Sequence, residues 1–181
     1  MVQAAFQVTD SLPRIGDPAA AERGLARWSR LPEAATCTPP AVLEPLLASI
    51  FGNSPYLSEL LLSEPAVLGR MLEIGPDAAL DGVLADDAAE PPGNRARLMG
   101  NLRRTKRRLA LLTALADITG RWPLERTTEV LSLFADLATQ QAVDLVLREV
   151  AQRGEIELAD PDRPQKESGL VVLGMGKLGA F

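Results

Sequence analysis

Apolar residues recur every three or four positions between residues 94 and 119, and a second such stripe extends over residues 123–153. This spacing places apolar side chains on one face of an α-helix. Pro123 near the start of the second stripe and Gly154 just after its end are typical of helix boundaries. We therefore predict two long helices that pack antiparallel, as in a helical bundle. The first stripe comprises Leu98, Leu102, Thr105, Leu109, Leu112 and Ala116, and the second comprises Val130, Phe134, Leu137, Gln141, Leu145 and Arg148, with Leu133 and Val146 widening it.

Prolines divide the preceding part of the chain into shorter apolar runs. Residues 53–55 (Asn-Ser-Pro) offer a helix-capping side chain followed by proline at the first helical position, and residues 63–65 repeat this signal. Gly52 ends the run before them. We predict three short helices within residues 41–72, a further one over residues 18–31, and another over residues 77–85.

The C-terminal part has a different composition. Residues 154–169 are polar and show no period, and the short apolar run Leu170, Val171, Val172 and Leu173 then predicts a β-strand that leads into a glycine-rich loop. We predict a mainly α fold that ends in the first strand of a truncated α/β domain. Its parts are a loosely ordered N-terminal segment with one short helix (1–40), a helical domain (41–157), a linker (158–169) and the start of the second domain (170–181).

Composition excludes several classes of function. The 181 residues include no histidine and one cysteine, Cys37, and carry a net charge of −5. The chain therefore has no imidazole base, no histidine-ligated metal, no internal disulfide and no thiolate zinc cluster. Its negative charge argues against a dedicated nucleic-acid binder. Because no 18 consecutive residues are apolar and no signal peptide is recognisable, we expect a cytoplasmic protein outside the membrane, with a core mainly of Leu, Ala and Val.

The loop after the predicted strand is the strongest candidate site. Gly174, Gly176, Lys177 and Gly179 could hold a phosphate, because glycine lets backbone N–H groups approach an anion and lysine adds a positive charge. The spacing is formally that of a Rossmann dinucleotide-binding loop, but that motif needs an acidic residue about 20 positions further on. A truncated Rossmann protein and a glycine-rich turn without a ligand both remain alternatives.

A second candidate is a cluster of seven basic residues between Arg95 and Arg108. It could bind an acidic partner surface, which would make the chain a helical interaction module, or nucleic acid in a salt-sensitive manner. The simpler interpretation is a solvated helix face that the acidic residues 77–90 neutralise. Asp81, Asp86 and Asp87 lack the spacing of a calcium loop, so we expect a solvated turn there and no metal site.

Residues 170–179, LVVLGMGKLG, resemble the start of the nucleotidyltransferase domain of the bifunctional glutamine synthetase adenylyltransferases. These enzymes attach AMP to glutamine synthetase and remove it. Residues 51–72 (FGNSPYLSELLLSEPAVLGRML) and the Arg-rich helix that leads into Ala-Asp-Ile-Thr-Gly at residues 116–120 are similar to the same family. The similarity covers about residues 40–180, in the order that the family uses.

The resemblance implies a nucleotidyltransferase that regulates nitrogen assimilation, and it places this chain in the half that removes AMP by phosphorolysis. It implies ATP, ADP, phosphate and Mg²⁺ as cofactors or substrates, and glutamine synthetase and PII signalling proteins as partners. The loop residues 174, 176, 177 and 179 correspond to the family's nucleotide-binding loop. The family continues with Arg-Glu-Leu-Asn and then Ser-Asp-x-Asp, whose aspartates hold the metal, whereas this sequence reads Ala180-Phe181. We therefore expect an N-terminal fragment without catalytic or metal-binding residues, which binds nucleotide poorly and catalyses nothing alone.

Overall fold

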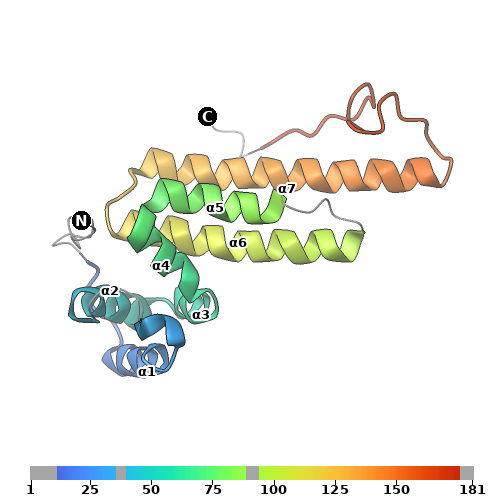
Figure 1. Cartoon of the computed structure of the whole chain (residues 1–181). Helices are drawn as coiled ribbons and strands as arrows, with labels where there is room; N and C mark the ends of the chain where they lie inside the picture. Colours follow the sequence, from blue (N-terminus) through green and yellow to red (C-terminus); the bar gives the residue numbers. More distant parts are fainter. Residues whose placement is uncertain (1–11, 36–39, 89–93, 176–181) are drawn as a thin grey trace.

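The computed structural model of the chain describes residues 12–35, 40–88 and 94–175, and helices form most of this part (Figure 1). The described residues contain no strand. The mainly α prediction is therefore confirmed. The elements are α1 (Pro18–Trp28), the 3-10 helix η1 (Pro32–Ala35), α2 (Pro40–Asn53), α3 (Pro55–Ser63), α4 (Pro65–Ile74), α5 (Pro76–Ala88), α6 (Arg95–Ile118) and α7 (Leu124–Gln152).

Capping side chains fix where the short helices begin. At the start of α3, the hydroxyl of Ser54 accepts a hydrogen bond of 3.2 Å from the N–H of Leu57. Asp17 caps α1 in the same way, accepting a bond of 2.9 Å from the N–H of Ala20. Glu64 precedes α4 but forms no such cap, because its carboxylate binds side chains of α6. The two proline-marked helix starts that the sequence predicted are thus confirmed, but the capping side chain expected at residues 63–65 is not found.

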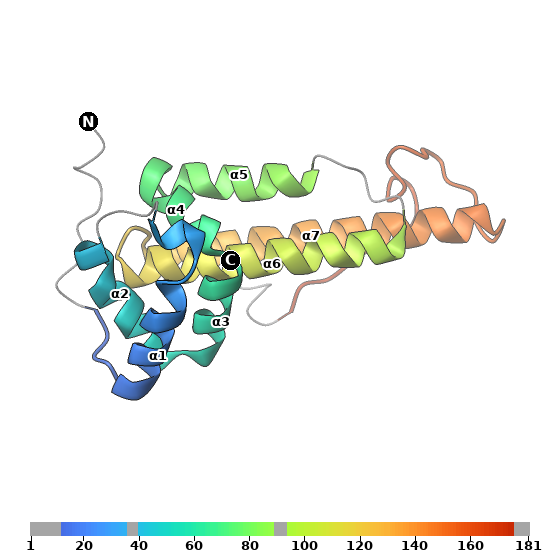
Figure 2. The ribbon, with the colours of Figure 1, turned by 60° about the horizontal axis from the view of Figure 1, so that its bottom comes forward.

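Helices α1 and α2 pack side by side at one end of the molecule (Figures 1 and 2). Gly24 of α1 lies directly against Phe51 of α2, so closely that a Cβ added at Gly24 would be 2.2 Å from Cγ of that ring. The absence of a side chain at residue 24 therefore sets the distance between the two helices. Trp28, at the end of α1, is 6% exposed and packs in the core, as a packing anchor should.

One hydrophobic core connects the short helices to α6. Leucine supplies most of this core, as the composition predicted. Trp122 is buried at the edge of the core, at the corner between α6 and α7. Helix α6 passes through its centre, because α3, α4, α5 and α7 all contact it. The leucines that are almost completely buried are Leu43, Leu46, Leu61, Leu68, Leu109, Leu111, Leu112 and Leu115.

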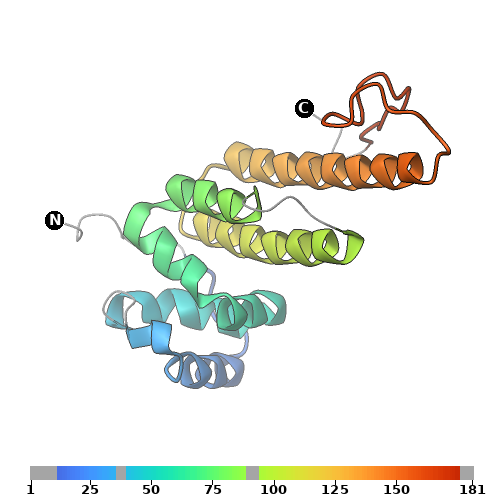
Figure 3. The same cartoon turned by 45° about the vertical axis from the view of Figure 1, so that its right-hand side comes forward.

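Helices α6 and α7 run antiparallel along much of their length, as predicted (Figures 1 and 3). Five of the six stripe positions of α6 are buried; Leu102 is half-buried. The prediction for α7 holds at Val130, which is 1% exposed, but is wrong for the two residues expected to widen the stripe. Leu133 and Val146 are 50% and 45% exposed. Both side chains stay exposed although the C-terminal segment also contacts α7, through hydrogen bonds from Arg148 to the carbonyls of Pro161 and Asp162 and from Gln165 to residues 140 and 144.

Within the described residues, α7 is the helix that is long and apolar enough to cross a membrane by length and composition alone. The core helix of a soluble protein passes the same test, so a single such helix is weak evidence for a membrane span.

The strand predicted for residues 170–173 is not formed. All four side chains are more than half exposed, and the segment is extended without regular structure. A strand needs a neighbouring strand to bond its N–H and C=O groups, and the described chain supplies none. The predicted first strand of an α/β domain is therefore wrong for this structure.

Hydrogen exchange should show this exposure directly. We expect the amide protons of Val171 and Val172 to exchange at close to the rate of an unstructured peptide, because neither has a hydrogen-bond partner within the described residues. The amides of Leu111 and Leu112 in the buried part of α6 serve as the slow reference. Protection of Val171 and Val172 comparable to that reference would contradict the prediction.

Candidate functional site

The structure describes only the beginning of the predicted phosphate loop. Gly174 lies at the end of the exposed segment that follows residue 169. Gly176, Lys177 and Gly179 lie outside the described residues, so the geometry of the loop stays a prediction. Cys37 lies outside them as well.

The basic cluster on α6 is divided among several contacts. Arg95 pairs with Glu149 of α7, and Arg107 and Arg108 both bind Glu64 at the corner between α3 and α4. Both carboxylates come from segments far from α6 in the sequence, which packing brings beside the helix. The expectation that the acidic residues 77–90 neutralise the cluster stays a prediction, because the side chains of residues 86–90 lie outside the described part of the structure.

Glu64 is the most enclosed of these carboxylates, with a side chain that is 11% exposed. Nε of Arg108 lies 2.9 Å from one of its oxygens, and Nη2 of Arg107 lies 3.1 Å from the other. Burial by itself would raise the pKa of Glu64, but hydrogen bonds and charge attraction from Arg108 and Arg107 outweigh it, so the pKa is lowered. The carboxylate stays ionised and ties the α3–α4 corner to α6.

A small cavity lies beside this carboxylate. It has a volume of about 70 Å³ and is lined by Glu64, Arg70 and Arg108 together with apolar residues of α4 and α5. Pockets that hold drug-sized ligands are roughly 300–1,000 Å³. This cavity is therefore too small for a nucleotide, and its charged lining serves to anchor the corner.

Replacing Glu64 with glutamine should lower the free energy of unfolding at pH 7 by about 2 kcal/mol, because two arginines lose a charged, largely buried acceptor. A carboxyl whose pKa is lower when folded stabilises the protein above its unfolded pKa. That stabilisation disappears as the pH falls through the folded pKa. We therefore expect the difference between wild type and Glu64→Gln to shrink below about pH 4.5, the ordinary pKa of glutamate.

Urea unfolding of both proteins from pH 7 to pH 3 measures this difference. Glu73→Gln is the matched control, because Glu73 is exposed on α4 and forms no ion pair within the described residues. A loss in Glu64→Gln that equals the loss in the control, or that grows as the pH falls, would contradict the assignment.

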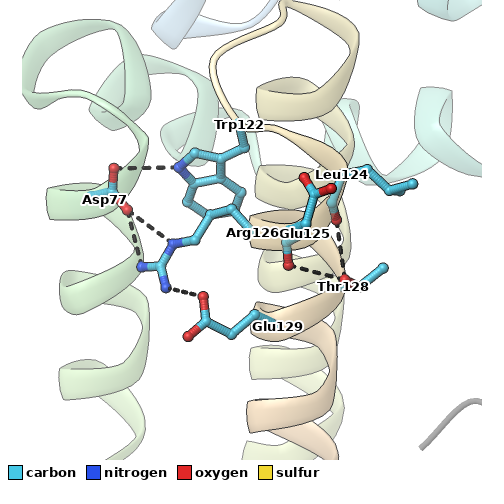
Figure 4. Close-up of polar contacts among 7 residues, drawn as sticks. All are labelled: Asp77, Trp122, Leu124, Glu125, Arg126, Thr128 and Glu129. Carbon is cyan, nitrogen blue, oxygen red and sulfur yellow. Dashed lines mark hydrogen bonds and ion pairs between the residues drawn. The ribbon is translucent and has the colours of Figure 1, made fainter. Parts of the chain in front are cut away.

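A second polar cluster joins the start of α5 to the corner before α7 (Figure 4). The carboxylate of Asp77 accepts a hydrogen bond of 3.3 Å from the indole N–H of Trp122 and one of 3.0 Å from Arg126. Arg126 also pairs with Glu129 at 2.8 Å and lies 5.5 Å from the centre of the Trp122 ring. Hydrogen bonds to Glu129 and then to Asp77 raise the pKa of Arg126. The cluster fixes the orientation of the corner between α5 and α7.

Sequence reasoning missed the roles of Glu64, Asp77 and Arg126. Their partners lie 43 to 49 positions away in the chain. No local spacing signals such a pair, because each forms only when separate helices meet.

The three aspartates considered for metal binding lie on a helix rather than in a turn. Helix α5 continues to Ala88, so it includes Asp81, Asp86 and Asp87, and the turn expected for the last two is wrong. The helix continues because residues 83–88 contain no glycine or proline to end it. Among the described residues, no three acidic, cysteine or histidine side chains are grouped so as to hold a metal ion.

Comparison with known proteins adds the decisive observation. The family model described as glutamate-ammonia ligase adenylyltransferase matches residues 45–181, which includes α3 to α7 and the glycine-rich segment. The chain belongs to this family. No solved structure matches it significantly.

Three curated members of the family show how much of the protein is shared. All are named bifunctional glutamine synthetase adenylyltransferase/adenylyl-removing enzyme. The one from Bradyrhizobium diazoefficiens is 38% identical over 93% of this chain and 18% of its own length. The one from Rhodopseudomonas palustris is 40% identical over 74% of this chain and 14% of its own length. The one from Mesorhizobium japonicum is 34% identical over 90% of this chain and 16% of its own length. The chain thus spans less than a fifth of each of these relatives.

Proposed function

We propose that this chain is a helical part of an enzyme that adenylylates and deadenylylates glutamine synthetase, and that it belongs to the half that removes AMP. The observation that carries the proposal is the family match over residues 45–181, which includes the segment LVVLGMGKLG. The proposed reaction is phosphorolysis. An oxygen of inorganic phosphate attacks the phosphorus of the AMP group, the bond from that phosphorus to the target protein breaks, and ADP and the unmodified target protein are released. Such control of glutamine synthetase regulates nitrogen assimilation.

In this proposal the helices support a nucleotidyltransferase domain that begins at residue 170. The exposed run of four apolar residues becomes a strand when sheet partners are available, and it brings the loop from Gly174 to Gly179 to the nucleotide. Lys177 supplies a positive charge to the phosphate groups. Aspartates of the family's Asp-x-Asp motif would hold Mg²⁺, which stabilises charge on the attacking and leaving oxygens.

The described residues fit a supporting role better than a catalytic one. Their two polar clusters, around Glu64 and around Asp77, are pairs of carboxylates and arginines that fix helix corners. The cavity beside Glu64 has a volume of about 70 Å³, which is too small for a nucleotide. We therefore propose that the 181 residues alone are inactive, and that PII signalling proteins act on the larger enzyme in the cytoplasm.

Incubation with adenylylated glutamine synthetase, phosphate and Mg²⁺ tests the proposal, with ADP release as the measurement. We expect no ADP from the 181 residues and clear release from a longer chain that includes the Asp-x-Asp motif. In the longer chain, Lys177→Gln should reduce the rate at least tenfold, whereas Lys166→Gln, an exposed lysine of the linker, should leave it unchanged. A longer chain that releases no ADP would contradict the assignment.

A further inference from the structure

The N-terminal half of α6 is an exposed basic surface on an acidic protein. It extends away from the group formed by α1 to α4 (Figures 1 and 3), and the chain as a whole has a net charge of −5. Most of its side chains face solvent, including Arg103, Arg104, Lys106 and Arg107. Four cations within five residues repel one another, and the pair Arg103 and Arg107 are one helical turn apart, where like charges destabilise a helix.

This helix binds carboxylates at both ends of the basic cluster. Arg95 holds Glu149 near the start of α6, and Arg107 and Arg108 hold Glu64 further along. Between these two contacts, Arg103 and Lys106 form no ion pair with any described residue. The middle turn therefore carries the same kind of cations as the turns on either side, but among the described residues no carboxylate pairs with them.

An exposed methionine completes this surface. Met99 is 43% exposed and lies four residues before Arg103 and seven before Lys106, a spacing that places all three on one helix face. Methionine is common on adaptable binding surfaces, because its unbranched chain fits varied apolar partners. We call Met99, Arg103 and Lys106 the Met99 face.

We propose that the Met99 face docks an acidic helix of a partner protein. Arginine and lysine would pair with carboxylates spaced one turn apart on that helix, and Met99 would contact an apolar residue between them. Nucleic acid fits less well. A protein that binds it tightly makes roughly six to ten phosphate contacts. This face offers two cations, Arg103 and Lys106, that form no ion pair within the described part of a chain of net charge −5.

Fluorescence anisotropy with a labelled 15-residue helical peptide tests the proposal. The peptide carries one glutamate in each turn and a leucine on the same face, and a second peptide has glutamine in place of each glutamate. We expect the glutamate peptide to bind and the glutamine peptide to bind at least fivefold more weakly. The double variant Arg103→Gln/Lys106→Gln should weaken binding of the glutamate peptide by about fivefold, as the loss of two exposed ion pairs implies.

The matched control is Arg23→Gln/Arg30→Gln at the other end of the molecule. It also removes two exposed arginines without an ion pair among the described residues, and we expect a change of less than twofold. Met99→Ala should weaken peptide binding without changing its dependence on salt, because no charge is lost. Circular dichroism melting checks that all variants remain folded.

Two results would overturn the proposal. The first is an equal loss of affinity in the α6 variant and the control, which would indicate attraction to charge in general. The second is tighter binding of a 15-base-pair DNA duplex than of the glutamate peptide at the same salt concentration, which would assign the face to nucleic acid.

Discussion

Replacing Leu112 with alanine should lower the free energy of unfolding by about 3 kcal/mol and the midpoint of thermal unfolding by about 10 °C. Leu112 is 0% exposed and lies on α6, which passes through the centre of the core. Truncating it removes apolar contacts and creates a cavity that several helices would have to move to fill. Urea unfolding followed by circular dichroism measures the change.

Leu133→Ala is the matched control for this experiment. It makes the same chemical change on α7, where the side chain is 50% exposed, so we expect a change within about 0.5 kcal/mol. Similar losses in both variants would mean that α6 does not form the centre of the core, and would contradict the fold described here.

Gly24→Ala should destabilise the protein by about 2 kcal/mol, although alanine favours helix more than glycine does. The new Cβ would lie 2.2 Å from Cγ and 2.5 Å from Cβ of Phe51. Both atoms are close to the backbone of α2, so Phe51 is unable to swing aside and the two helices must separate. Thermal unfolding measures the loss of stability, and fluorescence of Trp28 reports whether α1 has moved.

Gly100→Ala gives the opposite expectation for the same substitution. Gly100 lies inside α6 and an added Cβ would meet nothing within 4 Å, so we expect a gain of about 0.5–1 kcal/mol from helix propensity alone. Equal gains at both positions would show that α1 and α2 are not packed at Gly24. Equal losses would show that helix propensity does not govern the exposed half of α6.

Local chemistry was sufficient to predict most helix boundaries. Ser54 with Pro55 and Asp17 with Pro18 mark helix starts because a cap and a proline act within one turn of the backbone. The end of α5 was predicted too early, because an acidic composition was read as a turn although no residue there breaks a helix. An acidic composition indicates that a segment is exposed to solvent. It does not distinguish a turn from a helix on the surface, because both are exposed.

The candidate site was less accessible to prediction from sequence. The basic cluster was evident, but the sequence did not show which of its cations pair with described carboxylates. Glu64 reaches the cluster from the α3–α4 corner and Glu149 reaches it from α7. The apolar run at residues 170–173 was read as a strand, which requires partners that the described chain does not provide.

The sequence by itself determined the helical periodicity, the caps and the family, since each depends on residues close together or on the order of motifs. Only the tertiary structure decided that Gly24 must lack a side chain, that Leu133 and Val146 face solvent, and that Arg103 and Lys106 form no ion pair with any carboxylate among the described residues. The physical reason is that propensity and capping act within a turn or two of the chain. Burial and ion pairing depend on which helices meet, and the side chains that decide this lie tens of residues apart.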